Sequence, residues 1–120
     1  MSPEIEHHIL VIDDEPQILH VVQSVLEDEG FRVSVAASGE EALDRGEKPK
    51  LVVLDWMLPG QTGADLAPRL RSQHGDDLPI VVITADGRAA EKAQSIGAAG
   101  YVRKPFNIDE LVNTVRSSLT

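Results

Sequence analysis

The run LVVLDWMLPG, at residues 51–60, constrains the fold more than any other part of the chain. Four apolar residues lead directly into Asp55, and a Pro-Gly pair closes the run. An uninterrupted apolar segment of this length is typical of a strand buried on both faces, as in parallel sheets covered by helices. Asp55 is then expected where the strand leaves the sheet, the edge at which open α/β sheets bind ligands.

Four further apolar segments are predicted to be strands, and helical patterns alternate with them. The five predicted strands are residues 8–12, 32–36, 51–54, 80–83 and 100–103. The second alternates apolar and polar residues, which indicates a half-exposed strand at an edge of the sheet. Alternation of five strands with five helices predicts an α/β fold with right-handed crossovers. We therefore expect a single doubly wound, five-stranded parallel sheet with strand order 2-1-3-4-5.

Local signals at the helix ends give more specific predictions. Asp14 is a candidate N-cap for the first helix, and Ser38 and Asn107 are candidate caps for the second and last helices. Pro68 lies inside the predicted third helix, where it should bend the helix or move its start later. The fourth helix, residues 89–96, is alanine-rich and weakly amphipathic, so we expect it to be short or irregular.

Composition limits the class of protein. The chain has 120 residues and no internal linker or repeat, which predicts a lead-in at residues 1–7 and one domain at residues 8–120. No apolar run is long enough to span a bilayer and no secretory leader is evident, so a cytoplasmic location is expected. Cysteine is absent, which excludes disulfides and thiolate metal sites. A net charge of -9 argues against direct nucleic-acid binding and suits divalent cations or basic partners.

Charged and polar residues follow four of the predicted strands. Asp13 and Asp14 follow the first, Asp55 the third, Thr84 ends the fourth and Lys104 follows the fifth. Because parallel strands place their carboxyl ends on one side of the sheet, these groups should share a crevice. Each of them alone would more often be a cap, a turn former or a solvated charge. Their occurrence together makes the functional interpretation the stronger one.

The predicted crevice has the chemistry of a phosphoryl-transfer site. Three neighbouring carboxylates repel one another and need compensating positive charge. Lys104 supplies one charge, and oxygen-only ligands favour Mg²⁺, with Mn²⁺ as a possible substitute, over zinc. A carboxylate such as Asp55 can act as the nucleophile and form an acyl phosphate. Thr84 would hydrogen-bond one phosphoryl oxygen and Lys104 would pair with another.

Four motifs together resemble the receiver domain of bacterial two-component response regulators, a flavodoxin/CheY-like fold. The motifs are IDDEP at residues 12–16, LDWMLPG at 54–60, TA at 84–85 and YVRKPF at 101–106. The resemblance covers residues 8–119 and implies that Asp55 accepts a phosphoryl group from a phosphohistidine. The donor would be a sensor histidine kinase or a histidine phosphotransfer protein. The output would be a downstream protein or effector domain, and the chain would be a monomer or weak dimer.

The resemblance also implies roles for individual residues. Asp13, Asp14, Asp55 and the backbone carbonyl of Met57 would hold the metal. Thr84 and Tyr101 would form the switch, with Thr84 moving toward the phosphoryl group and Tyr101 turning inward behind it. The Lys104–Pro105 bond would be cis, Ala85 would leave room for a donor, and Met57 and Asp86 would tune phosphoryl lifetime. The segment from Thr84 to Gly97 is a couple of residues shorter than is usual in such domains.

Three other functions are compatible with parts of the pattern. A nucleotide-binding module would need a phosphate-cradling loop after the first strand, where Asp13 and Asp14 instead repel phosphate. A haloacid-dehalogenase-type phosphatase would need an acid two residues after the nucleophile, where Met57 stands. A receiver-like adaptor that binds proteins without phosphorylation remains the alternative to the switch. The switch would catalyse only its own phosphorylation and dephosphorylation and would not be a turnover enzyme. His7 and His8 are adjacent as in some metal sites, but we interpret them as lead-in residues.

Overall fold

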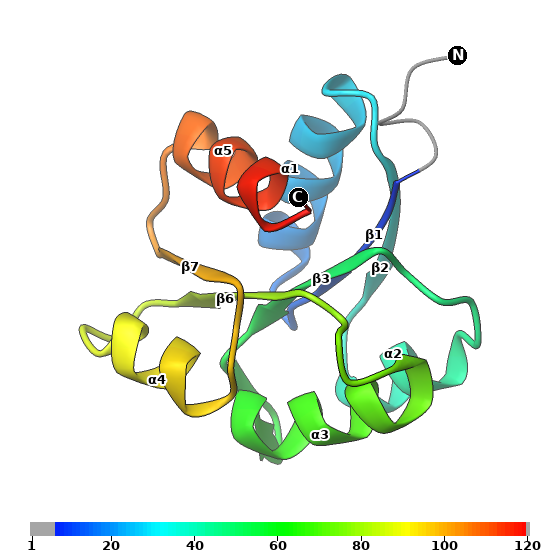
Figure 1. The fold of residues 1–120 in the computed structure, drawn as a ribbon. Coiled ribbons are helices and arrows are strands. Elements are labelled where there is room, and N and C mark those ends of the chain that lie inside the picture. The colour runs from blue at the N-terminus through cyan, green and yellow to red at the C-terminus, as the bar shows by residue number, and fades with distance from the viewer. Residues whose placement is uncertain (1–6, 120) are drawn as a thin grey trace.

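Five parallel strands form the centre of the molecule in a computed structural model that describes residues 7–119 (Figure 1). Six residues of the predicted lead-in, 1–6, lie outside the described residues. The sheet order is β2-β1-β3-β6-β7. Because β4 and β5 form a separate short hairpin, β6 and β7 are the fourth and fifth strands of the sheet, and the predicted order 2-1-3-4-5 is confirmed. The strands are β1 His8–Ile12, β2 Arg32–Ala36, β3 Leu51–Asp55, β6 Ile80–Thr84 and β7 Gly100–Arg103.

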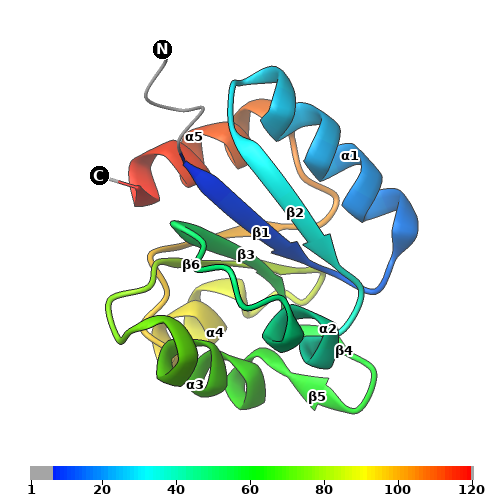
Figure 2. The same ribbon diagram turned by 90° about the vertical axis from the view of Figure 1, so that its right-hand side faces the viewer.

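Helices cover both faces of the sheet, as Figures 1 and 2 show. On one face lie α1 Pro16–Asp28 and α5 Ile108–Ser118, and on the other lie α2 Gly39–Asp44, α3 Gly63–His74 and α4 Ala89–Ser95. The fourth helix is short, as predicted, with seven residues. Within the described part of the chain, every helix is too short or too polar to traverse a bilayer.

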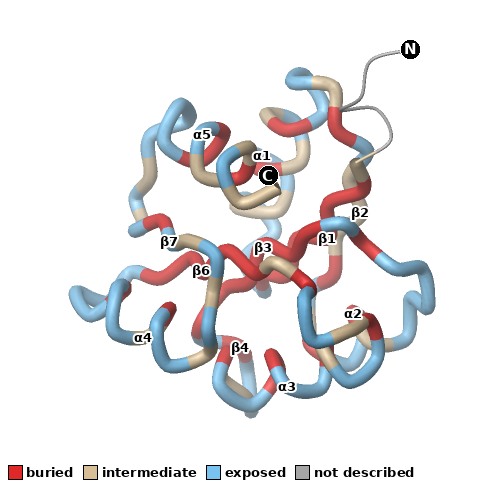
Figure 3. Tube along the Cα trace, viewed as in Figure 1, coloured by how far each residue is buried: buried red, intermediate tan, exposed pale blue. Residues whose placement is uncertain are grey.

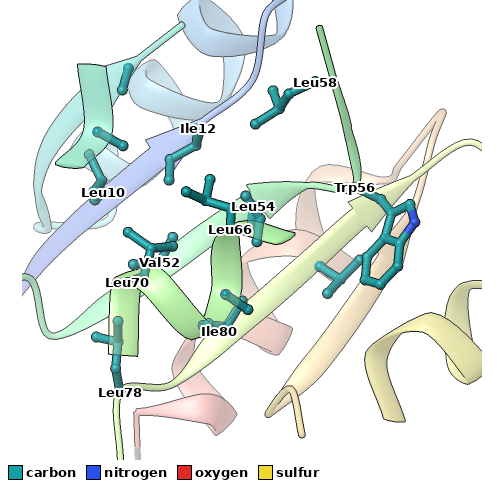
Figure 4. Packing of buried hydrophobic residues seen from close by; sticks show 14 of the residues in the cluster. Leu10, Ile12, Val52, Leu54, Trp56, Leu58, Leu66, Leu70, Leu78 and Ile80 are labelled. Carbon is teal, nitrogen blue, oxygen red and sulfur yellow. The ribbon is translucent and has the colours of Figure 1, made fainter. Parts of the chain in front are cut away.

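The strand residues divide into two cores by simple alternation. Leu10 and Ile12 of β1 face α2 and α3, together with Val52 and Leu54 of β3 (Figure 4). The intervening residues of the same strands face α1 and α5. Burial on both faces explains why β1, β3 and β6 are apolar except at one end residue each and appear almost wholly buried in Figure 3.

The strand register places the carboxyl ends of the inner strands at one edge. Ile12 lies opposite Leu54, and Asp55 lies opposite Ile83. Thr84 lies opposite Arg103, the residue before Lys104. Parallel pairing therefore brings the residues that follow β1, β3, β6 and β7 to the same side of the sheet.

Two local features differ from the sequence-based predictions. The N-cap of α1 is Glu15, so the assignment of Asp14 as the cap is wrong. Pro16 occupies the first turn and favours an extended residue before it, and Glu15 has ψ 112°. Pro68 does not delay α3, which begins at Gly63 and continues through the proline to His74.

A two-stranded antiparallel hairpin, β4 Met57–Leu58 and β5 Gln61–Thr62, was not predicted. Each strand is only two residues long, too short to show an alternating pattern. Gly60 makes the turn with φ 78°, a conformation that glycine adopts without steric cost. The hairpin directs the chain from the end of β3 into α3 and sets Met57 beside the site.

Candidate functional site

A cavity of about 410 Å³ lies at the carboxyl end of the sheet. Its walls come from the loops after β1, β3, β6 and β7 and from α4. The lining residues are Asp14, Glu15, Asp55, Met57, Thr84, Ala85, Asp86, Lys92 and Lys104. Because residues at or after the carboxyl end of every inner strand line it, this cavity is the crevice predicted from the sequence.

Three carboxylates meet at this cavity, and one of them, Asp13, lies buried behind its lining. One oxygen from each of Asp13, Asp14 and Asp55 lies within 4.8 Å of the others, and among the described residues no other such acidic or histidine cluster is found. Asp13 and Asp55 are buried, whereas Asp14 is exposed at the mouth. Asp13 Oδ1 also accepts a hydrogen bond of 2.9 Å from the backbone N–H of Glu15, which orients the side chain.

Lys104 is the cation that lies beside Asp13 and Asp55 of this cluster. Its Nζ lies 2.9 Å from Asp13 Oδ2, 3.5 Å from Asp55 Oδ2 and 3.6 Å from Glu15 Oε1. Its backbone N–H donates to the Thr84 carbonyl at 2.9 Å, and the Lys104–Pro105 bond is cis, as the resemblance implied. The end of β7 is thus fixed against β6 with the ammonium between the carboxylates.

The electrostatics of the cluster show an excess of negative charge. Burial and the charge of Asp13 raise the pKa of Asp55 to about 6, although Lys104 and a backbone hydrogen bond from Met57 oppose the rise. Burial would lower the pKa of Lys104, but the hydrogen bond and charge of Asp13, with Asp55 and Glu15, raise it. One ammonium does not balance three carboxylates, so the oxygen donors fit a hard divalent cation.

The residues predicted to act as the switch lie on neighbouring strands. Thr84 is buried at the end of β6, and its Oγ1 accepts a hydrogen bond of 3.1 Å from the backbone N–H of Asp86. Tyr101 on β7 lies opposite Val82 in the register and is 40% exposed. Met57 is also exposed and is one of the residues that line the cavity.

Sequence reasoning missed two lining residues, Glu15, which lies beside Lys104, and Lys92 of α4. Lys92 has the more informative contacts. Its Nζ lies 2.9 Å from Asp86 Oδ2 and 5.7 Å from the centroid of the Trp56 ring. Only the placement of α4 reveals this contact, because an isolated lysine in an alanine-rich helix gives no signal. The interpretation of His8 as a lead-in residue is wrong, because His8 is a buried residue of β1 whose Nε2 lies 2.7 Å from Ser34 Oγ. It lies at the opposite end of the strand from Asp13.

Comparison with known proteins assigns the family. The model of the response regulator receiver domain matches residues 9–116. The DNA-binding response regulator MtrA of Mycolicibacterium smegmatis is 42% identical over 115 residues, which cover 92% of this chain and 50% of MtrA. The chain belongs to the receiver domain family of response regulators. It spans about half the length of the curated relatives it matches.

Solved structures agree with this assignment. A putative response regulator from Chloroflexus aurantiacus has a TM-score of 0.85 and 38% identity, covering 94% of this chain and 97% of that one. Response regulator TrrA from Thermotoga maritima, solved in complex with Mg(2+)-BeF, has a TM-score of 0.83 and 36% identity, covering 93% of this chain and 98% of TrrA. The doubly wound, CheY-like fold predicted from the strand pattern is confirmed.

Proposed function

We propose that Asp55 is the phosphoryl acceptor of a two-component signalling switch. The observation that carries the proposal is the grouping of Asp13, Asp14 and Asp55, with the Lys104 ammonium beside Asp13 and Asp55. Asp55 is buried at the end of the central strand, yet it lines an open cavity from which a donor can approach. A carboxylate in that position attacks phosphorus and keeps the phosphoryl group as an acyl phosphate.

Mg²⁺ is the cofactor that fits the donor set, and Mn²⁺ would serve in its place. Asp13, Asp14, Asp55 and the Met57 backbone carbonyl would hold it, which accords with oxygen-only coordination. The ion supplies charge neutralisation for the incoming phosphoryl oxygens. Lys104 stays at Asp55 and pairs with another of those oxygens, and Ala85 leaves space beside them.

Thr84 and Tyr101 are the proposed switch. The Thr84 hydroxyl accepts a hydrogen bond from Asp86 N–H in this structure, so its own proton is available for a phosphoryl oxygen. Movement of Thr84 toward that oxygen would vacate space at the end of β6, and the exposed Tyr101 ring on β7 would turn into it. The surface made by α4, β7 and α5 would change as a result.

The proposed partners follow from the family and from the length of the relatives. A sensor histidine kinase or a histidine phosphotransfer protein would supply the phosphoryl group, and a downstream protein or effector domain would receive the signal. The matched relative is a DNA-binding response regulator of twice this length. We infer that any DNA contact is made outside residues 8–120, because this acidic domain repels phosphate backbones. A cytoplasmic monomer or weak dimer is the state we expect.

The test uses intact-mass spectrometry with acetyl phosphate and MgCl₂. We expect the wild-type chain to gain one phosphoryl group, and Asp55→Asn to gain none. Asp44→Asn at the exposed end of α2 makes the same chemical change elsewhere and should behave as wild type. Trp56, the single tryptophan, should change fluorescence on adding Mg²⁺ and again on adding beryllofluoride. Absence of phosphorylation and of both fluorescence responses would favour the phosphorylation-independent adaptor.

A further inference from the structure

A second ammonium, that of Lys92, lines the same cavity as Asp55 and Lys104. Its side chain is only 18% exposed although α4 is a short helix on the surface. The Nζ is held by Asp86 Oδ2 at 2.9 Å, and it lies over the Trp56 ring at 5.7 Å from the centroid. The attractive contact between a cation and an indole face adds to the ion pair and keeps the stem folded toward the cavity.

Trp56 and Asp86, which hold Lys92, are each within two residues of a residue of the proposed site. Trp56 follows Asp55 directly, and its own burial fixes the plane on which the ammonium rests. Asp86 donates its backbone N–H to Thr84 Oγ1, so the carboxylate that holds Lys92 belongs to the turn that holds Thr84. The four residues between β6 and α4 place Lys92 within reach of this turn.

The two lysines of the cavity have different surroundings. Lys104 lies among Asp13, Glu15 and Asp55, so its charge is engaged at the acceptor itself. Within residues 7–119, Lys92 pairs with one carboxylate, that of Asp86, whose side chain is 50% exposed. Ion pairs with an exposed partner contribute little net free energy, so a different carboxylate can replace Asp86 at low cost. Lys92 is therefore a charge that a bound donor can recruit.

We propose that Lys92 makes this domain selective for acyl phosphates among small phosphoryl donors, by stabilising the carboxylate that leaves. This inference rests on the proposed role of Asp55 as acceptor. Trp56 acts through Lys92 as a positioning residue, whereas Asp86 holds the ammonium until the leaving carboxylate replaces it.

The chemistry distinguishes two donors that deliver the same phosphoryl group. With acetyl phosphate, an Asp55 oxygen bonds to phosphorus, the bond between phosphorus and the acyl oxygen breaks, and the electron pair leaves with acetate. With phosphoramidate, whose nitrogen already carries the needed proton, the phosphorus–nitrogen bond breaks and neutral ammonia leaves. Negative charge develops on the leaving group only in the first case. A cation beside the leaving group therefore accelerates the first reaction selectively.

The experiment measures the rate of phosphorylation of the whole chain by each donor at fixed Mg²⁺, with intact mass as the readout. Lys92→Gln should lower the ratio of the acetyl phosphate rate to the phosphoramidate rate by roughly three- to tenfold. This is the rate effect expected from losing one charge–charge interaction in a partly solvated site. Lys92→Arg should keep the ratio near that of the wild type. Asp86→Asn, which keeps an oxygen for the Arg88 N–H but frees Lys92, should raise the ratio.

Lys50→Gln, an exposed residue before β3 at the opposite end of the sheet, is the charge-matched control and should leave the ratio unchanged. If Lys92→Gln lost the same fraction of the rate with both donors, or lost no rate, the inference would be overturned. The role of Asp55 as the acceptor would still stand. If wild type took a phosphoryl group from neither donor, the proposed function itself would fail. If Lys92→Gln did not fold, Asp86→Asn would still decide, because an unchanged or lower ratio there contradicts the inference.

Discussion

The two ends of the sheet treat charge in opposite ways. At the carboxyl end, three carboxylates share Lys104, and the pKa of Asp55 is raised to about 6 by burial and by Asp13. At the amino end, His8 is bonded to Ser34, and Glu47 pairs with Arg32 at 2.7 Å. The amino end therefore pairs its exposed charges, although the buried Nδ1 atoms of His7 and His8 have no hydrogen-bond partner. The carboxyl end instead has an excess of negative charge that destabilises the fold.

This difference shows that the folding stability lost to charge repulsion is lost at the carboxyl end, where the site lies. The apolar cores on both faces of the sheet are fully packed and hold the strands in register against the repulsion. A cluster that is poised for a cation must be poorly compensated without one, because groups that are already neutralised gain little from binding it. The amino end carries no such requirement and can be changed with smaller consequences. The predictions below test this contrast.

The largest expected effect is stabilisation by Asp55→Asn. A carboxyl pKa raised from 3.8 to about 6 destabilises the folded state only where Asp55 is ionised. The substitution should raise the free energy of unfolding by about 1–3 kcal/mol at pH 7.5 without metal. The gain should be complete above about pH 6 and vanish below about pH 4, where the carboxyl group is protonated in both states. Urea unfolding at several pH values measures it, and a destabilised variant would contradict the contrast.

A second expected effect is stabilisation by Mg²⁺ at the carboxyl end. At a free concentration 100 times the dissociation constant, an ion that binds only the folded state adds about 2.7 kcal/mol. Asp14→Asn should lose most of this gain, because it removes the exposed ligand without burying a new group. Thermal unfolding with MgCl₂ and with EDTA measures the effect. Glu47→Gln at the amino end is the matched carboxylate-to-amide control and should respond to Mg²⁺ as wild type does.

The same contrast explains how much of the molecule the sequence predicted. The grouping of Asp13, Asp55, Thr84 and Lys104 could be predicted from topology, because parallel pairing places the carboxyl ends of all the strands on the same side of the sheet. The cap of Asn107 was also predictable, because a side chain that bonds the N–H groups of Asp109 and Glu110 acts over two or three residues.

What the sequence did not predict depends on contacts between distant segments. Lys92 enters the site because α4 lies over Trp56, and no local pattern encodes that placement. Asp14 was assigned as a cap because its residue type is favourable, but Pro16 and the use of Glu15 N–H by Asp13 set the start of α1. A competing local bond thus outweighed the intrinsic preference of Asp14.

At the amino end, Ser34→Ala should have a smaller effect, a loss of about 1 kcal/mol at pH 7.5, because it removes the hydrogen bond with His8. Burial lowers the pKa of His8, with Glu47 opposing, so the folded state resists protonation more than the unfolded state does. Stability should therefore fall as pH drops below about 6.5, opposite in sign to the effect of Asp55. His8→Gln should remove this fall in urea titrations, and an unchanged pH dependence would show that another group causes the fall.

The smallest effect is expected from breaking the Arg32–Glu47 pair with Glu47→Gln. Both side chains are about half exposed, so water and salt screen the attraction and little stability depends on it. The same change of carboxylate to amide that stabilises the protein at residue 55 should leave the melting temperature nearly unchanged here. A double-mutant cycle with Arg32→Gln, at low and at moderate salt, isolates the pair. A coupling as large as the effect of Asp55→Asn would mean that the amino end also stores electrostatic strain, and that the contrast between the two ends does not arise from the site.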